Sequence, residues 1–286
     1  MISRRGVVHG LAGLMVPTLA GCGGTPPPPA RVANLTAGAY PPPALSPDGS
    51  WRPAVDGLDA VIDISHNVQV SDFRAVRSGG VLAVIHKTSE GGDWFDPSYA
   101  SRRREAEQAG LLWGGYHFGT RQYSGARQAE AFLSAARPGP TTLLALDYEL
   151  NDSNPANTMR ISQAEDFVQV IYRATGRFPV VYTDANWANG ERVRRGMRPE
   201  PVNPNSILAQ CDLWLADFHE QPEVPYAWAD RGWRLWQYVA NESVETAAYG
   251  AQPRASPGIT HCDRNLFAGD EQQLYRFWKS SGRAGA

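Results

Sequence analysis

From residue 60 onward, short apolar runs rich in Val, Ile and Leu alternate with amphipathic segments. Short continuous apolar runs are typical of strands that are buried on both faces of a sheet. The runs predict strands at 60–65, 81–87, 111–118, 142–149, 178–182, 213–218, 235–239 and, as an eighth candidate, 263–267.

Three amphipathic segments between the early runs predict helices at 97–109, 125–136 and 162–175. Ser162 and Glu165 have the spacing of a capping box at the start of the third helix. Regular alternation of strand and helix implies parallel strands joined by right-handed crossovers. Seven or eight such strands suit a closed barrel better than an open sheet. The helical pattern thins after Tyr182, so we expect an irregular α/β barrel.

The first 22 residues have the three parts of an export signal. Arg4 and Arg5 give a charged start, residues 7–19 are mostly apolar, and small residues precede Cys22. The apolar part is too short and too interrupted to span about 30 Å of hydrocarbon. A buried core helix is the alternative, but the glycines and prolines that follow Cys22 argue against it.

Residues 19–22, Leu-Ala-Gly-Cys, resemble the lipobox of bacterial lipoproteins, in which the cysteine is diacylated and becomes the new N-terminus. The resemblance implies lipidation at Cys22, and two or three acyl chains suffice for stable anchoring to a membrane. Residues 3–8 resemble a twin-arginine export motif, which leaves the export route open. Gly23 and Gly24 are no obvious inner-membrane retention signal, so we expect an outer-membrane lipoprotein if the source has two membranes.

These features divide the chain into a signal peptide (1–22), a Pro-rich flexible linker (23–57), a barrel domain (58–280) and a flexible tail (281–286). Proline runs at 26–29 and 41–43 favour extended polyproline II conformation. We expect the linker to hold the barrel away from the bilayer.

Composition narrows the class of function. The 9 Trp, 11 Tyr and 9 Phe are too many for a chain that is disordered throughout. With 27 Lys and Arg against 29 Asp and Glu, no global basic field attracts nucleic acid, and we expect no nucleic-acid partner. No cysteine or histidine spacing suggests zinc, and we expect neither a metal nor a cofactor. Cys211 and Cys262 remain after lipidation; their expected places at opposite barrel ends disfavour a disulfide but leave it open.

Catalytic groups of parallel α/β barrels lie at the carboxyl ends of the strands. The run at 142–149 ends with Asp147 and Glu149, which point to the same side of a strand at a spacing of roughly 7 Å. Two carboxylates in one poorly solvated cavity do not both ionise easily, so we expect one raised pKa. A protonated acid beside an ionised partner is what cleavage of a glycosidic bond requires. The alternative is a strand that has simply reached solvent.

Other predicted strands end in polar and aromatic residues, a composition typical of sugar sites. The set comprises Asp63, Tyr116, Phe118, Tyr182, Trp214 and Gln237. For each aromatic residue, packing inside the barrel is the alternative. We interpret His86 and His117 as structural residues and Lys87 as the partner of a neighbouring carboxylate.

Taken in order, these motifs resemble glycoside hydrolase family 25, the muramidases (lysozymes) that cut the β-1,4 bond between N-acetylmuramic acid and N-acetylglucosamine. The resemblance covers roughly residues 60–278. Its matching stretches are 61–65, 84–91, 115–118, 146–149, 179–183, 213–218, 235–238 and 263–267. It implies an irregular TIM-like (β/α) barrel with about five β/α units followed by extra strands.

The resemblance also implies roles for the acids. Glu149 is the general acid, Asp147 orients or stabilises the substrate's 2-acetamido group, and Asp63 and Asp263 complete the acidic cluster. The residues that contact sugar are expected to be Tyr116, Phe118, Tyr182, Trp214 and Gln237. A retaining, substrate-assisted route is favoured over inversion, in which Asp63 or Asp263 would activate water.

We therefore expect a membrane-tethered, monomeric muramidase whose partner is the glycan strand of peptidoglycan. Two alternatives remain open from the sequence. One is a lipoprotein that binds peptidoglycan without cleaving it, and the other is a different hydrolase of N-acetylglucosamine polymers, such as a chitinase.

Overall fold

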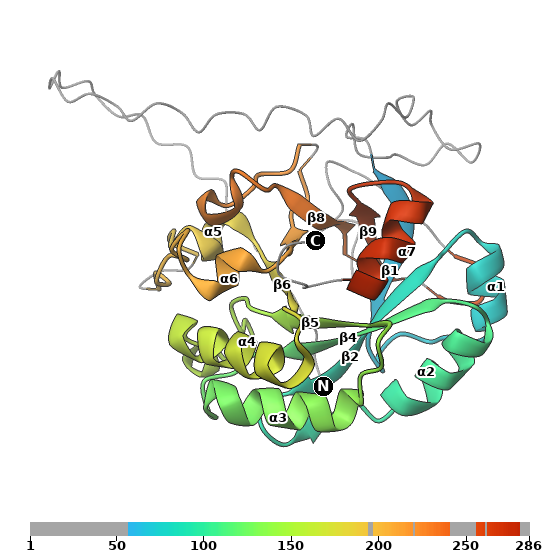
Figure 1. The fold of residues 1–286 in the computed structure, drawn as a ribbon, viewed down its shortest axis with the longest axis horizontal. Helices are drawn as coiled ribbons and strands as arrows, with labels where there is room; N and C mark the ends of the chain where they lie inside the picture. Colours follow the sequence, from blue (N-terminus) through green and yellow to red (C-terminus); the bar gives the residue numbers. More distant parts are fainter. Residues whose placement is uncertain (1–56, 194–196, 220, 241–255, 261, 281–286) are drawn as a thin grey trace, which may run out of the picture.

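The computed structural model describes residues 57–193, 197–219, 221–240, 256–260 and 262–280, which form a barrel of strands with helices packed outside it (Figure 1). The predicted signal peptide, Cys22, most of the linker and the tail lie outside these described residues.

Within the described residues, eight strands close the barrel, in the order β1-β9-β8-β7-β6-β5-β4-β2, with β2 pairing back to β1. Their bounds are β1 (Leu58–Ile64), β2 (Ala83–Glu90), β4 (Leu112–Phe118), β5 (Thr142–Asp147), β6 (Val180–Thr183), β7 (Leu213–Ala216), β8 (Trp233–Val239) and β9 (Asp263–Phe267). A short strand, β3 (Trp94–Phe95), forms an antiparallel hairpin with β2. The predicted irregular α/β barrel is confirmed.

Helices α1 (Phe73–Ser78), α2 (Tyr99–Gln108), α3 (Gly125–Ala136) and α4 (Ile161–Thr175) connect the strands from β1 to β6. Beyond β6 the connections hold only the four-residue helices α5 (Ala185–Ala188) and α6 (Ile207–Gln210) and a short 3₁₀ turn at Tyr226–Trp228, within the described part of the chain. The thinning of helices that the sequence indicated is therefore real. A further 3₁₀ turn lies at Pro155–Asn157, and helix α7 (Glu271–Ser280) follows the last strand.

The start of α4 differs from the predicted capping box. The Arg160 backbone N–H donates to Gln163 Oε1 at 3.0 Å, so the helix begins before Ser162 and Gln163 is the residue that reaches back. Glu165 instead accepts a hydrogen bond from the Ser206 hydroxyl at 2.7 Å, which joins α4 to the start of α6. The Ser162–Glu165 prediction was wrong because two pairs of polar residues in this segment are three positions apart, 160 with 163 and 162 with 165, and the spacing alone does not tell them apart.

Strand β9 runs antiparallel to both of its neighbours, β8 and β1, whereas the other pairs around the barrel are parallel. The sequence pattern led us to expect parallel strands throughout. The reversal has a direct consequence for the site. Asp263 is the first residue of β9, and the reversed direction puts it at the end of the barrel where the parallel strands finish.

The buried apolar residues form two layers. An outer cluster lies between strands and helices, and an inner cluster fills the barrel. Leu274, Phe277 and Trp278 of α7 belong to the inner cluster, and Trp278 Nε1 donates to the Trp113 carbonyl at 2.8 Å. Trp113 lies near the start of β4, so α7 closes the amino-terminal end of the barrel (Figure 1).

Helices α3 and α4 approach closely at Gly125, the first residue of α3. A Cβ at this position would lie 1.9 Å from the Gln163 carbonyl oxygen, so only glycine fits between the two helices. This contact holds the outer layer behind β4 and β5.

Cys211 and Cys262 are both buried free thiols and do not form a disulfide. Burial raises the pKa of Cys262 to about 12, so its thiol stays protonated at neutral pH.

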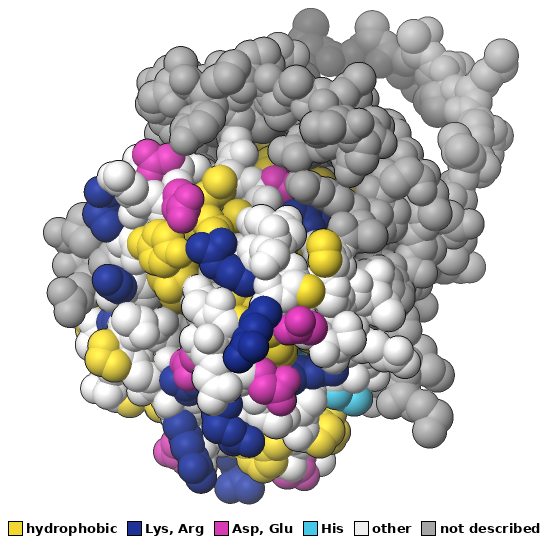
Figure 2. All heavy atoms as spheres, turned by 90° about the vertical axis from the view of Figure 1, so that its right-hand side faces the viewer, with side chains coloured by type: hydrophobic (Ala, Val, Ile, Leu, Met, Phe, Trp, Pro, Cys, Tyr) yellow, Lys and Arg dark blue, Asp and Glu magenta, His cyan; other side chains and the backbone are white. Residues whose placement is uncertain are grey.

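One side of the molecule carries side chains of both charges. Figure 2 shows basic and acidic side chains interspersed on the described part of this side, with small hydrophobic areas between them. In the described part of the chain, we find no helix with the length and apolarity needed to cross a membrane.

Candidate active site

Asp63, near the carboxyl end of β1, is the centre of a buried hydrogen-bond network. Its side chain is buried, with the residue 1% exposed. Asp63 Oδ2 accepts from Gln237 Nε2 at 2.8 Å and from Asn265 Nδ2 at 3.0 Å. Side chains from β1, β8 and β9 therefore converge on one carboxylate oxygen.

The two amides are themselves oriented by aromatic donors. Trp214 Nε1 donates to Asn265 Oδ1 at 2.6 Å, and the Tyr182 hydroxyl donates to Gln237 Oε1 at 2.9 Å. An indole N–H can only donate, so the oxygen of Asn265 must face Trp214 and its NH₂ must face Asp63. Each aromatic residue thus fixes the direction of an amide that holds Asp63.

Asp263 joins the same network. It is the direct partner of Asp63 in the β1–β9 register, and Gln237 Nε2 also donates to Asp263 Oδ2 at 3.2 Å. Cα atoms of directly opposed antiparallel residues lie about 4.5–5.5 Å apart. Asp63 and Asp263 are therefore neighbouring carboxylates bridged by one amide group.

Asp147 and Glu149 lie at the end of β5, on the same edge of the barrel. Asp147 is 2% exposed and is the register partner of Phe118 on β4 and of Tyr182 on β6. Tyr148 packs outward, with its ring centroid 5.9 Å from that of Trp187. The strand ends at Asp147, and Glu149 follows two residues later at the mouth of the barrel. Glu149 is half-buried and lies in the bend after the strand.

The predicted sugar-contacting aromatic residues are more deeply placed than the sequence suggests. Tyr116 is 0%, Trp214 1% and Tyr182 4% exposed. The Trp214 ring lies edge-on to both tyrosines, with centroids 6.3 Å from Tyr116 and 4.9 Å from Tyr182. These rings pack inside the barrel and support the acidic cluster from below. Phe118 is also buried.

Asn265 is the residue that sequence reasoning missed. It stands two positions after Asp263 on β9, and alternation along the strand would have placed both side chains on one face. The prediction of Asp263 as a site residue would therefore have been enough to predict Asn265 as its neighbour in the site.

Lys87 has the role that the sequence indicated. Its Nζ lies 2.5 Å from Glu90 Oε2, and 4.8 and 5.2 Å from the ring centroids of Trp94 and Phe118. The ion pair and the two rings hold the ammonium group beside the carboxyl ends of β2 and β4.

His86 and His117 are both buried behind the strands. Burial lowers the pKa of His117 to about 3 and that of His86 to about 4. His117 Nε2 and Gln128 Oε1 are 3.2 Å apart, Nδ1 lies 2.9 Å from the Ser89 hydroxyl, and the ring stacks on Phe167. Both imidazoles are neutral at physiological pH, in keeping with their interpretation as structural residues.

Among the residues that the structure describes, no three His, Cys, Asp or Glu side chains are arranged to hold a metal ion. The arrangement offers buried carboxylates, amide donors and a half-buried glutamate at one end of a barrel. Such groups can transfer a proton and stabilise positive charge.

Comparison with known proteins gives consistent matches. The family model described as "Glycosyl hydrolases family 25" matches residues 62–247. Lysozyme M1 of Streptomyces globisporus is 28% identical over 225 residues, which cover 74% of this chain and 69% of that protein. An N,O-diacetylmuramidase of Arthroderma benhamiae is 28% identical over 226 residues, covering 76% of this chain and 85% of the relative.

Solved structures agree. A family 25 lysozyme from Aspergillus fumigatus superposes with a TM-score of 0.61 at 26% identity, covering 79% of this chain and 100% of that one. A bacterial lysozyme from Streptomyces coelicolor gives a TM-score of 0.61 at 25% identity, with 80% and 99% coverage.

Replacement of Asn265 by Leu tests the network around Asp63. The substitution removes a donor to a buried carboxylate and the acceptor of Trp214 Nε1, so the free energy of unfolding should fall by roughly 1–3 kcal/mol. Urea denaturation measures it. Asn205→Leu, at an exposed asparagine before α6, is the control and should change stability by no more than about 0.5 kcal/mol. Equal stability of the two variants would show that the network contributes nothing.

His117 should make stability depend on pH. Between pH 6.5 and about 3, the unfolded chain binds a proton at this position and the folded chain does not. Stability is therefore lost as the pH falls through this window, by about 1.4 kcal/mol per pH unit. Between pH 6.5 and 4.5, His117→Gln should lose about 2–3 kcal/mol less than the parent in urea denaturation. A His117→Gln variant that loses as much stability as the parent over this range would show that His117 is not buried neutral.

Proposed function

The chain belongs to glycosyl hydrolases family 25, and from this premise we propose that it is a lysozyme-type muramidase that cleaves the β-1,4 bond between N-acetylmuramic acid and N-acetylglucosamine in peptidoglycan. The observation that carries the proposal is the gathering of Asp63, Asp147, Glu149 and Asp263 at one end of a family 25 barrel. Relatives named lysozyme and N,O-diacetylmuramidase support the substrate.

Glu149 is the general acid in this proposal. It is the more exposed member of the Asp147–Glu149 pair, so it can reach the oxygen of a glycosidic bond at the barrel mouth. Protonation of that oxygen lets the leaving sugar depart as an alcohol. Asp147, buried and fixed between β4 and β6, orients the 2-acetamido group of the sugar that remains.

On the favoured route, the acetamido oxygen attacks the anomeric carbon as the glycosidic bond breaks, and Asp147 stabilises the positive charge that develops on the acetamido nitrogen. Water then opens this intermediate, with Glu149 taking the proton it gives up, and the configuration is retained. Asp63 and Asp263 supply negative charge beneath the sugar. Their bridge through Gln237 keeps them in place during the reaction.

The proposal includes the position of the protein. Residues 1–22 direct export, Cys22 carries the lipid anchor, and the linker tethers the barrel to a membrane, which is the outer membrane if the source has two. The lipobox-like residues 19–22 and the proline-rich composition of 23–57 support it.

Substitution of Cys22 by Ala tests the anchor. Without a thiol to acylate, the protein should move from the membrane fraction to the soluble fraction on cell fractionation. Gly24→Ala, two residues further along, is the matched control and should stay with the membrane. The anchor would be refuted if the Cys22 variant fractionated as the parent does.

Replacement of Glu149 by Gln tests the catalytic assignment. The amide cannot donate a proton to the glycosidic oxygen, so hydrolysis of purified peptidoglycan should fall by at least about 100-fold while binding to insoluble peptidoglycan persists. Glu130→Gln, an exposed glutamate on α3, is the matched control and should keep full activity. Unchanged turnover in the Glu149 variant would overturn its role.

The products identify the bond. Mass spectrometry of digested, defined muropeptides should find N-acetylmuramic acid at every new reducing end. N-acetylglucosamine at the new reducing ends would refute the muramidase proposal.

A further inference from the structure

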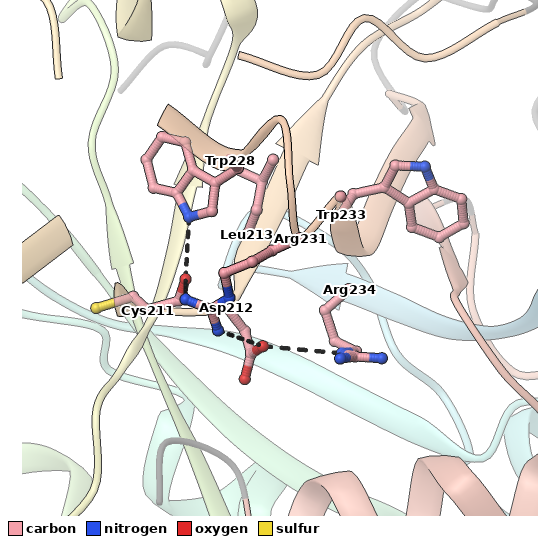
Figure 3. A pocket seen from close by; sticks show the side chains of 8 residues that line it. Cys211, Asp212, Leu213, Trp228, Arg231, Trp233 and Arg234 are labelled. Carbon is pink, nitrogen blue, oxygen red and sulfur yellow. Dashed lines mark hydrogen bonds and ion pairs between the residues drawn. The ribbon is translucent and has the colours of Figure 1, made fainter. Parts of the chain in front are cut away.

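The end of the barrel opposite the acidic cluster carries a cavity and several arginines. This amino-terminal end is formed by the segments that precede the parallel strands and by α7. The cavity has a volume of about 160 Å³ and is lined by residues 211–213, 228 and 231–234 at the starts of β7 and β8 (Figure 3).

Arg231 and Arg234 provide the positive charge of this cavity. Both guanidinium groups are directed towards the Asp212 carboxylate, at 3.4 and 3.8 Å, and both remain partly exposed, at 45% and 41% (Figure 3). These separations are long for ion pairs, and one carboxylate faces two guanidinium groups. A net positive charge is therefore left at the surface beside the half-buried indole of Trp233.

Further cations lie on the same end of the barrel. Arg103 and Arg177 both bond to the segment before β5: Arg103 donates to the Ala136 carbonyl at 2.8 Å and Arg177 to the Pro140 carbonyl at 3.1 Å. Arg276 and Lys279 are exposed on α7.

Acids also lie at this end, but they are fewer. Glu107 pairs with Arg103 at 2.9 Å, and Asp212 is shared by two arginines. Near α7 and the start of β8 there are also Asp230, Asp270 and Glu271. The basic residues at this end include, in addition to the six named above, Arg137 and Arg173. Basic side chains therefore remain in excess.

The opposite end carries the acidic cluster. Asp63, Asp147, Glu149 and Asp263 gather there, and Lys87 beside them is paired with Glu90. A negatively charged surface would therefore attract the end at which exposed arginines are in excess.

The chain enters the barrel at the positive end, because β1 begins with Leu58 and runs parallel to β2. The segment that leads to Cys22 therefore joins the domain on this face. We propose that the amino-terminal face of the barrel, centred on Arg231 and Arg234, is a docking surface for the anionic headgroups of a phospholipid membrane. Docked in this way, the domain presents its acidic end away from the bilayer.

The docking surface rests on the proposed membrane tether and adds a contact that does not depend on acylation. Each basic residue near an anionic membrane surface strengthens binding by about fivefold. Trp233 suits the interface because an indole combines an apolar ring with a polar N–H.

Vesicle co-sedimentation tests the surface. The mature chain from residue 22 onward, with Cys22→Ala so that it cannot be acylated, is mixed with vesicles of phosphatidylglycerol and phosphatidylcholine or of phosphatidylcholine alone. We expect binding to the anionic vesicles only, and its loss at high salt, because exposed charges are screened. Equal binding to both vesicle types would overturn the proposal.

Three variants in the same background locate the contact. R231Q/R234Q should weaken vesicle binding by about 10- to 30-fold, and D212N should strengthen it by about fivefold, because it removes a negative charge from the same cavity. R121Q/R127Q removes two charges from the segment that follows β4, at the opposite end, and should leave binding unchanged. Equal weakening by both double variants would show a non-specific response to net charge and refute the surface.

Arg231 also donates to the Ala209 carbonyl at 2.8 Å, so its removal can disturb folding. R276Q/K279Q, at exposed positions of α7, gives a second reading and should weaken binding by a comparable factor. If this variant and D212N both bind as the parent does, the proposal fails even where R231Q/R234Q is weakened.

Two further measurements distinguish a membrane surface from a free polyanion and from the active site. Soluble poly(glycerol phosphate) at matched phosphate concentration should compete poorly with vesicles; full competition would assign the face to a free polyanion and overturn the membrane assignment. Hydrolysis of soluble muropeptides by R231Q/R234Q should equal that of the parent, whereas failure of the muramidase proposal appears in the Glu149 variant and leaves the vesicle result unaffected.

Discussion

The shared acceptor Asp63 Oδ2 is the constraint on which the end of the barrel depends. A buried carboxylate must be hydrogen-bonded, and here the donors come from β8 and β9 while the acid sits on β1. Satisfying it fixes the positions of three strands at once. The pairing of β9 with its two neighbours is irregular on these strands. The register shifts between Asp59 and Val61 on β1 and between Gln237 and Val239 on β8. Local departures of this kind re-aim side chains, and they are found beside sites where direction matters more than regular pairing.

The reversed direction of β9 is also explained by the contacts with Asp63. A strand running parallel to its neighbours would carry Asp263 at the amino-terminal end, far from Asp63, and leave Asn265 unable to reach it. Running antiparallel, β9 brings its first residues to the carboxyl ends of the other strands. Apolar patterning reveals where β9 lies but not its direction, because a buried strand looks the same from either end. The place of Asp263 in the cluster came from the family resemblance, and the strand reversal is its physical explanation.

Much of the rest could be predicted from local pattern. The strand at 263–267 and the helix at 125–136 have the bounds that the sequence indicated. Predictions failed where more than one sequence pattern fitted the same segment, as at Ser162 and Glu165. They also failed where tertiary contacts determine the structure. Helix α7 was not foreseen, although its apolar residues close the barrel, and for Tyr116 and Trp214 the sequence left packing inside the barrel and contact with sugar as alternatives. Sequence identifies these aromatic residues as occupants of strand ends; only packing shows that they support the acids from inside the barrel.

A barrel built in this way has two independent surfaces. Segments that follow the parallel strands form one end and segments that precede them form the other, with a packed interior between. The acidic cluster depends on the first set, and the arginines around Asp212 depend on the second. Substitutions in one set therefore leave the geometry of the other intact. Because Leu58 enters among the second set, the proposed tether and the proposed docking surface lie on the same face, and neither involves the residues that hold Asp63.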